Sequence, residues 1–186
     1  LNPDKTIQMS GGYFPNLINT FTWSLGLDDL PLVNKIIKPI HPHTPTFYTH
    51  DNFFKNDHKQ DWVTGAFMMV KKDLFEAAGG FDQQIFMYTE EMELCYRLAK
   101  KGNETFYTNT PSIIHLGGAS SGSYLAFTAE IKNMIYFWKK HMPAWQLPFI
   151  KMFFWIGSLL RLLIFGIIKG DAKARRAYFH ALGFII

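Results

Sequence analysis

The sequence predicts an α/β fold for residues 1–142, followed by a helical tail over residues 143–186. Strand-like and helix-like segments alternate between residues 61 and 118, as expected for a mixed sheet with helices packed on it. The charge balance then changes: residues 1–130 contain 10 Lys and Arg against 14 Asp and Glu, whereas residues 131–186 contain 9 against one acid. A mildly acidic body is therefore followed by a basic, apolar segment.

Composition narrows the class of protein. A chain of 186 residues with 48% hydrophobic and 18% charged residues has the make-up of one globular domain with room for an appendage. The aromatic share, 17% with 18 Phe, is high for a plain globular domain and suggests contact with lipid or sugar. Cys95 is the one cysteine, which excludes an internal disulfide and a cysteine-based zinc site.

Residues 61–72, with the sequence DWVTGAFMMVKK, predict a buried strand, because β-branched and aromatic residues precede two lysines. Gly65 and Ala66 in the middle of this segment carry almost no side chain, which leaves room for a ligand or for another backbone. The 60 residues before it contain six prolines, which interrupt any long helix and predict mostly loop.

The following segments complete the alternation. Residues 72–81, KDLFEAAGGF, predict a short helix that stops at its glycine pair. Residues 85–88 predict a short apolar strand. Residues 104–118 predict further strand, ending at His115 before a Gly- and Ser-rich loop.

Residues 90–102 predict a helix that starts with three carboxylates. At about 100° per residue, Glu90, Glu93 and Arg97 fall on one charged face. Glu93 and Arg97 have the i,i+4 spacing of a stabilising ion pair on a solvated helix surface. Glu91 instead projects into the face that carries the leucines, where the core is expected.

A carboxylate directed toward a core is costly unless it is paired, hydrogen-bonded or faces a cleft. Partial burial would raise its pKa, whereas the helix N-terminus would lower it. Such a position suits a general base. The alternative is that Glu91, in the first turn, reaches sideways to water and has no chemical role.

The segment from Trp62 to Ser121 resembles the C-terminal half of the catalytic domain of inverting family 2 glycosyltransferases. It is most similar to the rhamnosyltransferase and galactofuranosyltransferase-like group. That group shows a Trp-x-x-Gly-Ala strand, a Gly-Gly-Phe-Asp turn, an aromatic run into Glu-Asp-x-Asp-Leu-x-x-Arg, and a strand ending in His before a Gly/Ser loop. The matching residues here are Trp62, Gly65, Ala66, Gly79, Gly80, Phe81, Asp82, Glu90, Glu91, Glu93, Leu94, Arg97 and His115.

The resemblance implies a GT-A fold that binds a nucleotide-diphosphate sugar through Mg²⁺ or Mn²⁺. It also implies a base that deprotonates an acceptor hydroxyl for in-line attack at the anomeric carbon. Glu91 matches the position of that base, where the group usually has Asp, and either carboxylate can accept a proton within hydrogen-bond reach.

The resemblance assigns roles to other residues as well. Glu90 would orient the acceptor, Trp62 would stack on a sugar ring, and Gly65 and Ala66 would lie on the substrate side of the strand. His115 would contact the metal or the diphosphate.

The resemblance also leads us to expect that the nucleotide-binding half of the domain, with its metal-binding Asp-x-Asp motif, precedes Leu1. Residues 1–142 would then be the acceptor-side half of a GT-A domain. The opening LNPDKTIQMSGGYFP is similar to the segment that follows the nucleotide-binding half in this group.

The tail contains an apolar run, residues 152–168, which has Arg161 as its one charge and lysines at both flanks. Its 17 residues are marginal for a span, which needs about 20. A peripheral helix on the membrane and a short span are both open, and a helix buried against other parts of the protein is the third alternative. Aliphatic stretches between the basic residues favour an anionic membrane surface over nucleic acid.

Together, these observations predict a glycosyltransferase of cell-surface polysaccharide synthesis at the cytoplasmic face of a membrane. Its expected partners are a nucleotide-diphosphate sugar, a glycan or lipid-linked acceptor and the membrane surface, with no nucleic acid. The alternative is a non-catalytic membrane-associated module that needs a partner for activity.

Overall fold

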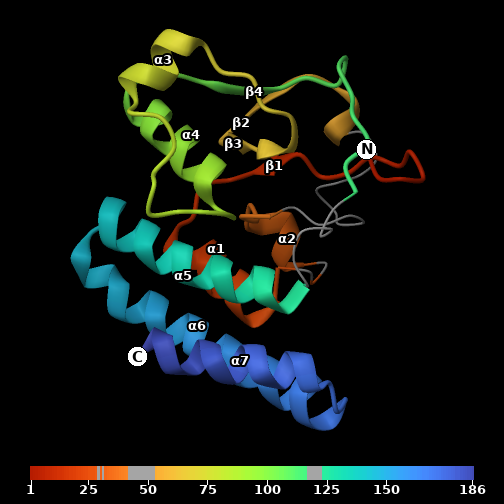
Figure 1. Ribbon diagram of the computed structural model, residues 1–186, viewed down its shortest axis with the longest axis vertical. Helices are drawn as coiled ribbons and strands as arrows, with labels where there is room; N and C mark the ends of the chain where they lie inside the picture. The colour runs from red at the N-terminus through yellow and green to blue at the C-terminus, as the bar shows by residue number, and fades with distance from the viewer. Residues whose placement is uncertain (29, 31, 42–52, 117–122) are drawn as a thin grey trace. The chain divides into compact units, whose positions relative to one another are not determined.

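A computed structural model describes residues 1–28, 30, 32–41, 53–116 and 123–186, and it divides into two compact units (Figure 1). The α/β unit comprises Leu1–Pro15 and Asp29–Gly117, and the helical unit comprises Asn16–Asp28 and Gly118–Ile186. The boundary predicted at residues 142 and 143 falls inside the helical unit. The Gly- and Ser-rich loop predicted after His115 begins at Gly117 and lies largely outside the described residues.

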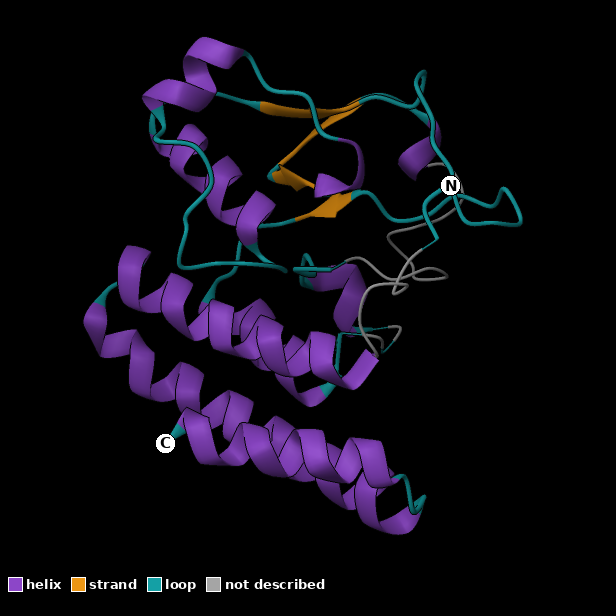
Figure 2. Cartoon of the chain, viewed as in Figure 1, coloured by secondary structure: helices purple, strands orange, loops and turns teal. Residues whose placement is uncertain are grey.

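Four short strands are described in the α/β unit, and they form two separate antiparallel pairs (Figure 2). Strand β1 (Gly11–Gly12) pairs with β3 (Trp62–Val63), with Gly12 opposite Trp62. Strand β2 (His58–Gln60) pairs with β4 (Thr105–Tyr107). Helices with small sheets agree with the predicted α/β class, although both described pairings are antiparallel.

The long buried strand predicted over residues 61–72 is wrong. The strand stops at Val63, and residues Gly65–Phe67 form a 3₁₀ turn, η2, because the Thr64 hydroxyl accepts a hydrogen bond from the backbone N–H of Ala66 at 3.4 Å. The side chains beyond this turn do not all enter the core, since Met69 is 91% exposed.

The strand predicted over residues 85–88 is also wrong, and the one predicted over residues 104–118 is limited to β4. Tyr88 and Thr89 have φ of 67° and 79°, which is left-handed backbone that no strand adopts. Residues 85–88 instead form an irregular approach to the next helix.

The helices of the α/β unit follow the predicted positions more closely. Short segments η1 (Phe53–Lys55) and α2 (Val33–Ile36) precede α3 (Lys72–Ala77) and α4 (Glu90–Lys100). The predicted glycine stop of α3 is confirmed: Gly79 and Gly80 have φ of 83° and 71°, and the Gly80 N–H donates to the Phe75 carbonyl at 2.9 Å.

The prediction that Glu93 lies on a solvent face of α4 is wrong. Glu93 is 0% exposed, and its carboxylate accepts two hydrogen bonds from Nε of Arg97, at 2.9 and 2.8 Å. The remaining guanidinium nitrogens donate to the carbonyls of Ala78 and Gly80, which follow α3. The pair is therefore buried, because the chain after α3 covers this side of the helix.

Five helical segments are described in the helical unit. They are α1 (Leu17–Leu25), α5 (Ser123–His141), α6 (Leu147–Arg161), the π-helical η4 (Leu162–Ile168) and α7 (Ala172–Ile185), with a 3₁₀ turn, η3 (Ala144–Gln146), before α6. Helix α6 packs against α1, α5 and α7, and α5 also packs against α7. Their shared core contains Trp23, Ile131, Met134, Phe137, Trp138, Ile150, Phe154, Ala181 and Ile185.

Helix α1 and helix α6 meet closely at Gly157. A Cβ atom at this position would overlap the carbonyl oxygen of Ser24, so only glycine allows the two backbones to approach this far. One turn later, the Arg161 guanidinium donates to the carbonyls of Ser24 and, at 3.2 Å, Trp23, and it lies 4.5 Å from the centre of the Phe127 ring. The arginine thus satisfies carbonyls at the C-terminal end of α1.

Candidate functional site

The start of α4 lies against the turn that follows β3. The backbone N–H of Gly65 donates to Oε1 of Glu91 at 3.2 Å. A Cβ atom on Gly65 would sit 3.8 Å from the same oxygen, so the two segments are in van der Waals contact. Four predicted site residues, Glu90, Glu91, Gly65 and Ala66, are therefore brought to one place.

The backbone that leads into this site is strained. Tyr88 and Thr89 are two consecutive non-glycine residues with positive φ, a conformation that costs about 1–3 kcal/mol per residue and clusters at functional sites. Thr89 is the N-cap of α4, yet its side chain makes no capping hydrogen bond. This strained pair fixes the direction in which α4 starts, and nothing in the sequence pattern indicated it.

The two carboxyl groups at the helix start influence each other. Burial, and then the negative charge of Glu91, raise the pKa of Glu90 to about 7. Oε2 of Glu90 and Oε2 of Glu91 are both buried and have no hydrogen-bond partner among the described residues. Near neutral pH the pair can hold one proton on Glu90, and the two Oε2 atoms are left without a hydrogen-bond partner from the described part of the chain, at a place that is shielded from solvent.

Trp62 occupies a different environment from the one predicted. It is 7% exposed, its indole N–H donates to the Tyr13 carbonyl at 3.3 Å, and its ring meets the His41 ring edge to face at 5.4 Å. The described structure uses this ring in the core, so little of it is open for stacking on a sugar.

His115 is exposed and is tied to the N-terminal segment. Its Nδ1 lies 2.8 Å from Oε1 of Gln8, and its backbone N–H donates to the Leu1 carbonyl at 2.9 Å. A carboxamide oxygen only accepts hydrogen bonds, so this contact requires the tautomer with the proton on Nδ1, in which Nε2 has the lone pair of the neutral ring. That nitrogen could serve as one ligand of a metal.

The described residues include no group of three His, Cys, Asp or Glu side chains that could hold a metal ion. His115 alone is not a metal site. Mg²⁺ is often held by only one or two protein ligands together with substrate phosphates, so the residues fit a metal only if the donor substrate supplies most of its ligands.

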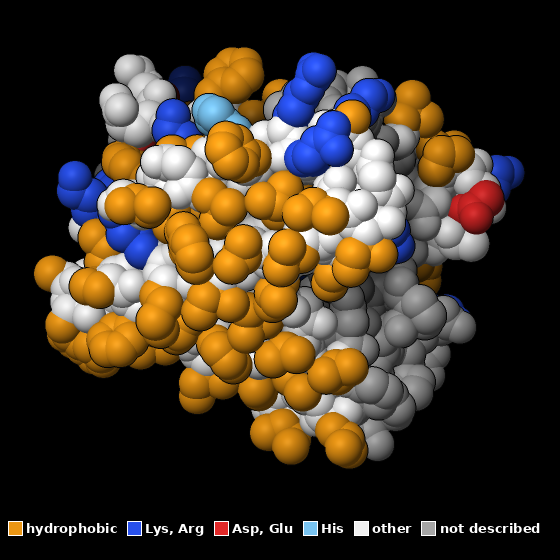
Figure 3. Space-filling view, turned by 90° about the horizontal axis from the view of Figure 1, so that it is seen from below, with side chains coloured by type: hydrophobic (Ala, Val, Ile, Leu, Met, Phe, Trp, Pro, Cys, Tyr) orange, Lys and Arg blue, Asp and Glu red, His pale blue; other side chains and the backbone are white. Residues whose placement is uncertain are grey.

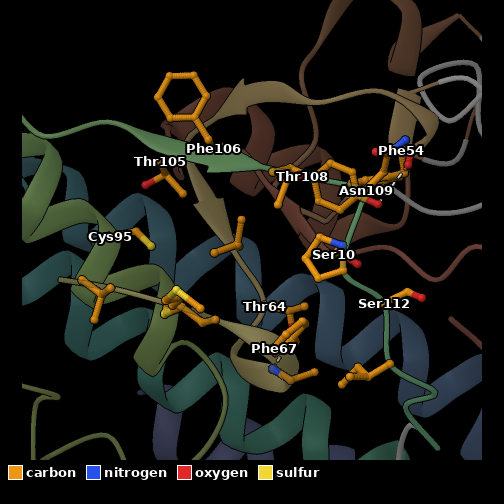
Figure 4. A pocket seen from close by; sticks show the side chains of 18 of the residues that line it. Ser10, Phe54, Thr64, Phe67, Cys95, Thr105, Phe106, Thr108, Asn109 and Ser112 are labelled. Atoms are coloured by element: carbon orange, nitrogen blue, oxygen red, sulfur yellow. Dashed lines mark hydrogen bonds between the residues drawn. The ribbon is translucent and has the colours of Figure 1, made fainter.

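A pocket of about 630 Å³ lies within the α/β unit, beside the η2 turn. In Figure 4 its wall includes Thr64 and Phe67 at this turn, Cys95 on α4 and Thr105 on β4. Ala66 and His115 also line it, which brings these two predicted site residues to one cavity. The sequence did not predict this pocket, because residues 61–72, several of which line it, were predicted to form a buried strand.

Curated proteins match the chain over part of its length. An N-acetylglucosaminyl-diphospho-decaprenol L-rhamnosyltransferase of Mycobacterium tuberculosis is 26% identical over 153 residues, which cover 79% of this chain and 46% of that protein. Rhamnosyltransferase WbbL of Escherichia coli K12 is 36% identical over 75 residues, which cover 39% of this chain and 28% of that protein.

These relatives confirm the resemblance to rhamnosyltransferases that the motifs predicted. The chain spans less than half the length of either relative. No family model matches the chain, and no solved structure matches it.

Proposed function

We propose that this protein is a glycosyltransferase that moves a sugar from a nucleotide-diphosphate sugar to a hydroxyl group of a glycan or lipid-linked acceptor, with inversion, in cell-surface polysaccharide synthesis. The observation that carries the proposal is the carboxylate of Glu91, positioned by the Gly65 N–H within a segment that resembles rhamnosyltransferases. The names of the relatives make L-rhamnose the first sugar to test.

In the proposed reaction, Glu91 is the general base. Its carboxylate takes the proton of the acceptor hydroxyl while that oxygen attacks the anomeric carbon, and the bond to the nucleoside diphosphate breaks on the opposite side. Attack opposite the leaving group inverts the anomeric centre. Gly65 supports this role because its N–H binds Oε1, while Oε2 is buried and has no hydrogen-bond partner among the described residues.

Glu90 supports the same chemistry as an acceptor-orienting group. Burial and the charge of Glu91 raise the pKa of Glu90 to about 7, so it can carry a proton near neutral pH, and a protonated carboxyl donates a hydrogen bond that a carboxylate cannot. Gly65 and Ala66 expose their backbone to substrate beside it. We assign Trp62 an indirect role, in which its buried ring holds β3 in place.

The cofactor we propose is Mg²⁺ or Mn²⁺. When bound, the ion would neutralise charge on the departing diphosphate. His115, through Nε2, is the residue of this chain that we expect to contact the ion or the diphosphate. We place the enzyme at the cytoplasmic face of a membrane, where a lipid-linked acceptor is presented. Among the described residues one helical stretch, Ala144–Ile168, is long and apolar enough to cross a membrane, by length and composition only.

Replacing Glu91 with Gln tests the base assignment. In membranes from cells that express the full open reading frame, Glu91→Gln should lower sugar transfer by at least about 100-fold, the usual contribution of a general base. Binding of the nucleotide sugar should be unchanged. Glu76→Gln is the matched control, because Glu76 is an exposed partner of Lys72 on α3 and is not among the residues that line the pocket. Transfer retained in the Glu91 variant would exclude it as the base.

The second candidate is a non-catalytic module that needs a partner. It is favoured by apolar side chains left open on the α/β unit: Phe67, Met69 and Phe106 are 51%, 91% and 61% exposed. Metal-dependent binding of a nucleotide sugar to residues 1–186 alone would count against this candidate. No binding by residues 1–186, together with transfer when a second polypeptide is added, would support it.

A further inference from the structure

The helical unit carries an apolar face that its own core does not use. Phe149, Met152, Trp155, Leu160, Leu163 and Ile167 are between 36% and 60% exposed. At about 100° per residue, those in α6 fall on the side of the helix opposite Ile150 and Phe154, which are buried. Figure 3 shows hydrophobic side chains spread over a broad face, with lysines and arginines along its edge.

We propose that this unit is an in-plane membrane platform: α6 and η4 lie flat on an anionic bilayer with their outer face among the acyl chains, and neither crosses it. The inference deepens the membrane association that is part of the proposed function. It specifies that lipid covers the apolar face and that α6 lies parallel to the membrane surface.

Charge complementarity identifies the occupant. The helical unit contains 9 Lys and Arg against Asp28, Glu130 and Asp171, a net charge of +6. Asp28 is buried and Asp171 caps the start of α7, so the acids do little to balance the exposed bases. Each Lys or Arg near an anionic bilayer strengthens binding about fivefold.

The basic residues lie where headgroups would meet an embedded helix. Lys169 directly follows η4 and is exposed. On α7, the exposed side combines Arg175 and Arg176 with Phe179, which is 72% exposed. Apolar side chains bordered by cations are the pattern of a helix in the interface plane.

Arg161 explains why the apolar stretch does not cross the bilayer. Its guanidinium is bound to the carbonyls of Trp23 and Ser24 at the end of α1, so α6 cannot move into lipid without α1. The buried residues of α1 combine Trp23 with polar side chains, among them Asn19, Thr20 and Ser24. A span would carry these polar side chains to membrane depth, where hydrocarbon surroundings make them costly, whereas the in-plane arrangement leaves the described contacts of the unit intact.

Vesicle co-sedimentation of residues 1–186, without any sugar nucleotide, tests the surface. The chain should bind phosphatidylcholine vesicles containing roughly one quarter phosphatidylserine, and bind pure phosphatidylcholine more weakly. The double variant Trp155→Ser, Leu163→Ser should bind at least about tenfold more weakly, with unchanged circular dichroism. The double variant Arg175→Gln, Arg176→Gln should bind anionic vesicles about 30-fold more weakly than the wild type and should bind neutral vesicles almost equally well.

Phe86→Ser is the matched control, because Phe86 is 92% exposed but belongs to the α/β unit. Equal loss in this control, equal binding to neutral and anionic vesicles, or capture of a protein with no affinity for lipid would each overturn the proposal. The readout is independent of catalysis, so failure here leaves the glycosyltransferase proposal untouched, and the reverse also holds.

Cysteine labelling tests the orientation. Gln146→Cys and Lys169→Cys place one thiol at each end of the stretch, and native Cys95 is buried and serves as background. A membrane-impermeant maleimide added outside intact vesicles should label both positions equally. Labelling of only one of the two would show a span and overturn the in-plane arrangement.

Discussion

At the scale of single residues, Glu91 and Glu93, two positions apart on α4, show what a helical projection can and cannot predict. The projection separated Glu91 from its neighbours correctly, and the structure places it against Gly65. It misplaced Glu93, because an i,i+4 ion pair looks the same in sequence whether or not another segment covers it. The segment that covers this pair contains Ala78 and Gly80, whose backbone carbonyls accept hydrogen bonds from Arg97. Every residue has a backbone carbonyl, so the sequence does not reveal which ones will bind the arginine.

The buried position of Glu93 predicts a large effect on stability. Glu93→Ala leaves the Arg97 cation partly buried without its carboxylate, which typically costs about 3–5 kcal/mol in the free energy of unfolding. Urea denaturation followed by circular dichroism measures this. Glu104→Ala removes the exposed bridge to Lys59 and should cost less than about 1 kcal/mol. Equal effects in the two variants would mean that Glu93 is solvated.

Glu90 predicts a pH dependence with a definite sign. Its pKa is about 7 in the folded protein against 4.5 ordinarily, so between these values the folded state holds a proton that the unfolded chain has released. Through this group, the free energy of unfolding therefore falls as pH rises from about 4.5 to 7, and it is constant above that range. Glu90→Gln should remove this part of the slope.

The measurement compares urea unfolding at several pH values for the wild type, Glu90→Gln and Glu76→Gln. Glu76 lies on the surface of α3 and pairs with Lys72, so its variant should retain the wild-type slope. An unchanged slope in the Glu90 variant would show that Glu90 ionises normally in the folded state.

At the scale of elements, helices were predicted better than strands. The positions of α3 and α4 follow from apolar spacing and from glycine stops, which are local properties of the chain. Strands depend on partners distant in sequence: β1 pairs with β3 across about 50 residues, and each pairing involves only two or three residues per strand. An apolar run such as residues 66–70 cannot show by itself whether a neighbouring strand will pair with it.

The contact between α1 and α6 predicts opposite effects for two glycines in helices. Gly157→Ala introduces a methyl group that meets the Ser24 carbonyl, and such overpacking typically costs about 1–3 kcal/mol. Gly183→Ala in α7 has open space and should be neutral or stabilising by up to about 1 kcal/mol. Thermal unfolding followed at the helical circular dichroism signal distinguishes them. Similar changes in thermal stability for the two variants would contradict the close approach of α1 and α6 at Gly157.

At the scale of the whole molecule, the motif pattern of residues 62–121 predicted the family resemblance, and the relatives confirmed it over part of the chain. The predicted site came together only in part. Glu90, Glu91, Gly65 and Ala66 meet because α4 packs on β3. Trp62 is instead in the core. Its role was mispredicted because an aromatic residue in a strand can serve core packing or sugar binding, and the sequence pattern is the same for both.

The helical unit is assembled from two distant stretches of chain, Asn16–Asp28 and Gly118–Ile186. The polypeptide therefore passes between the two units three times, and α1 completes a hydrophobic core whose other members come more than 90 residues later. Deleting everything after residue 142 would remove α6 and α7 from this core. It would leave the Trp23 side chain and the last carbonyls of α1 without the partners that α6 supplies, so the helical unit and the unit that bears Glu90 and Glu91 depend on one continuous chain.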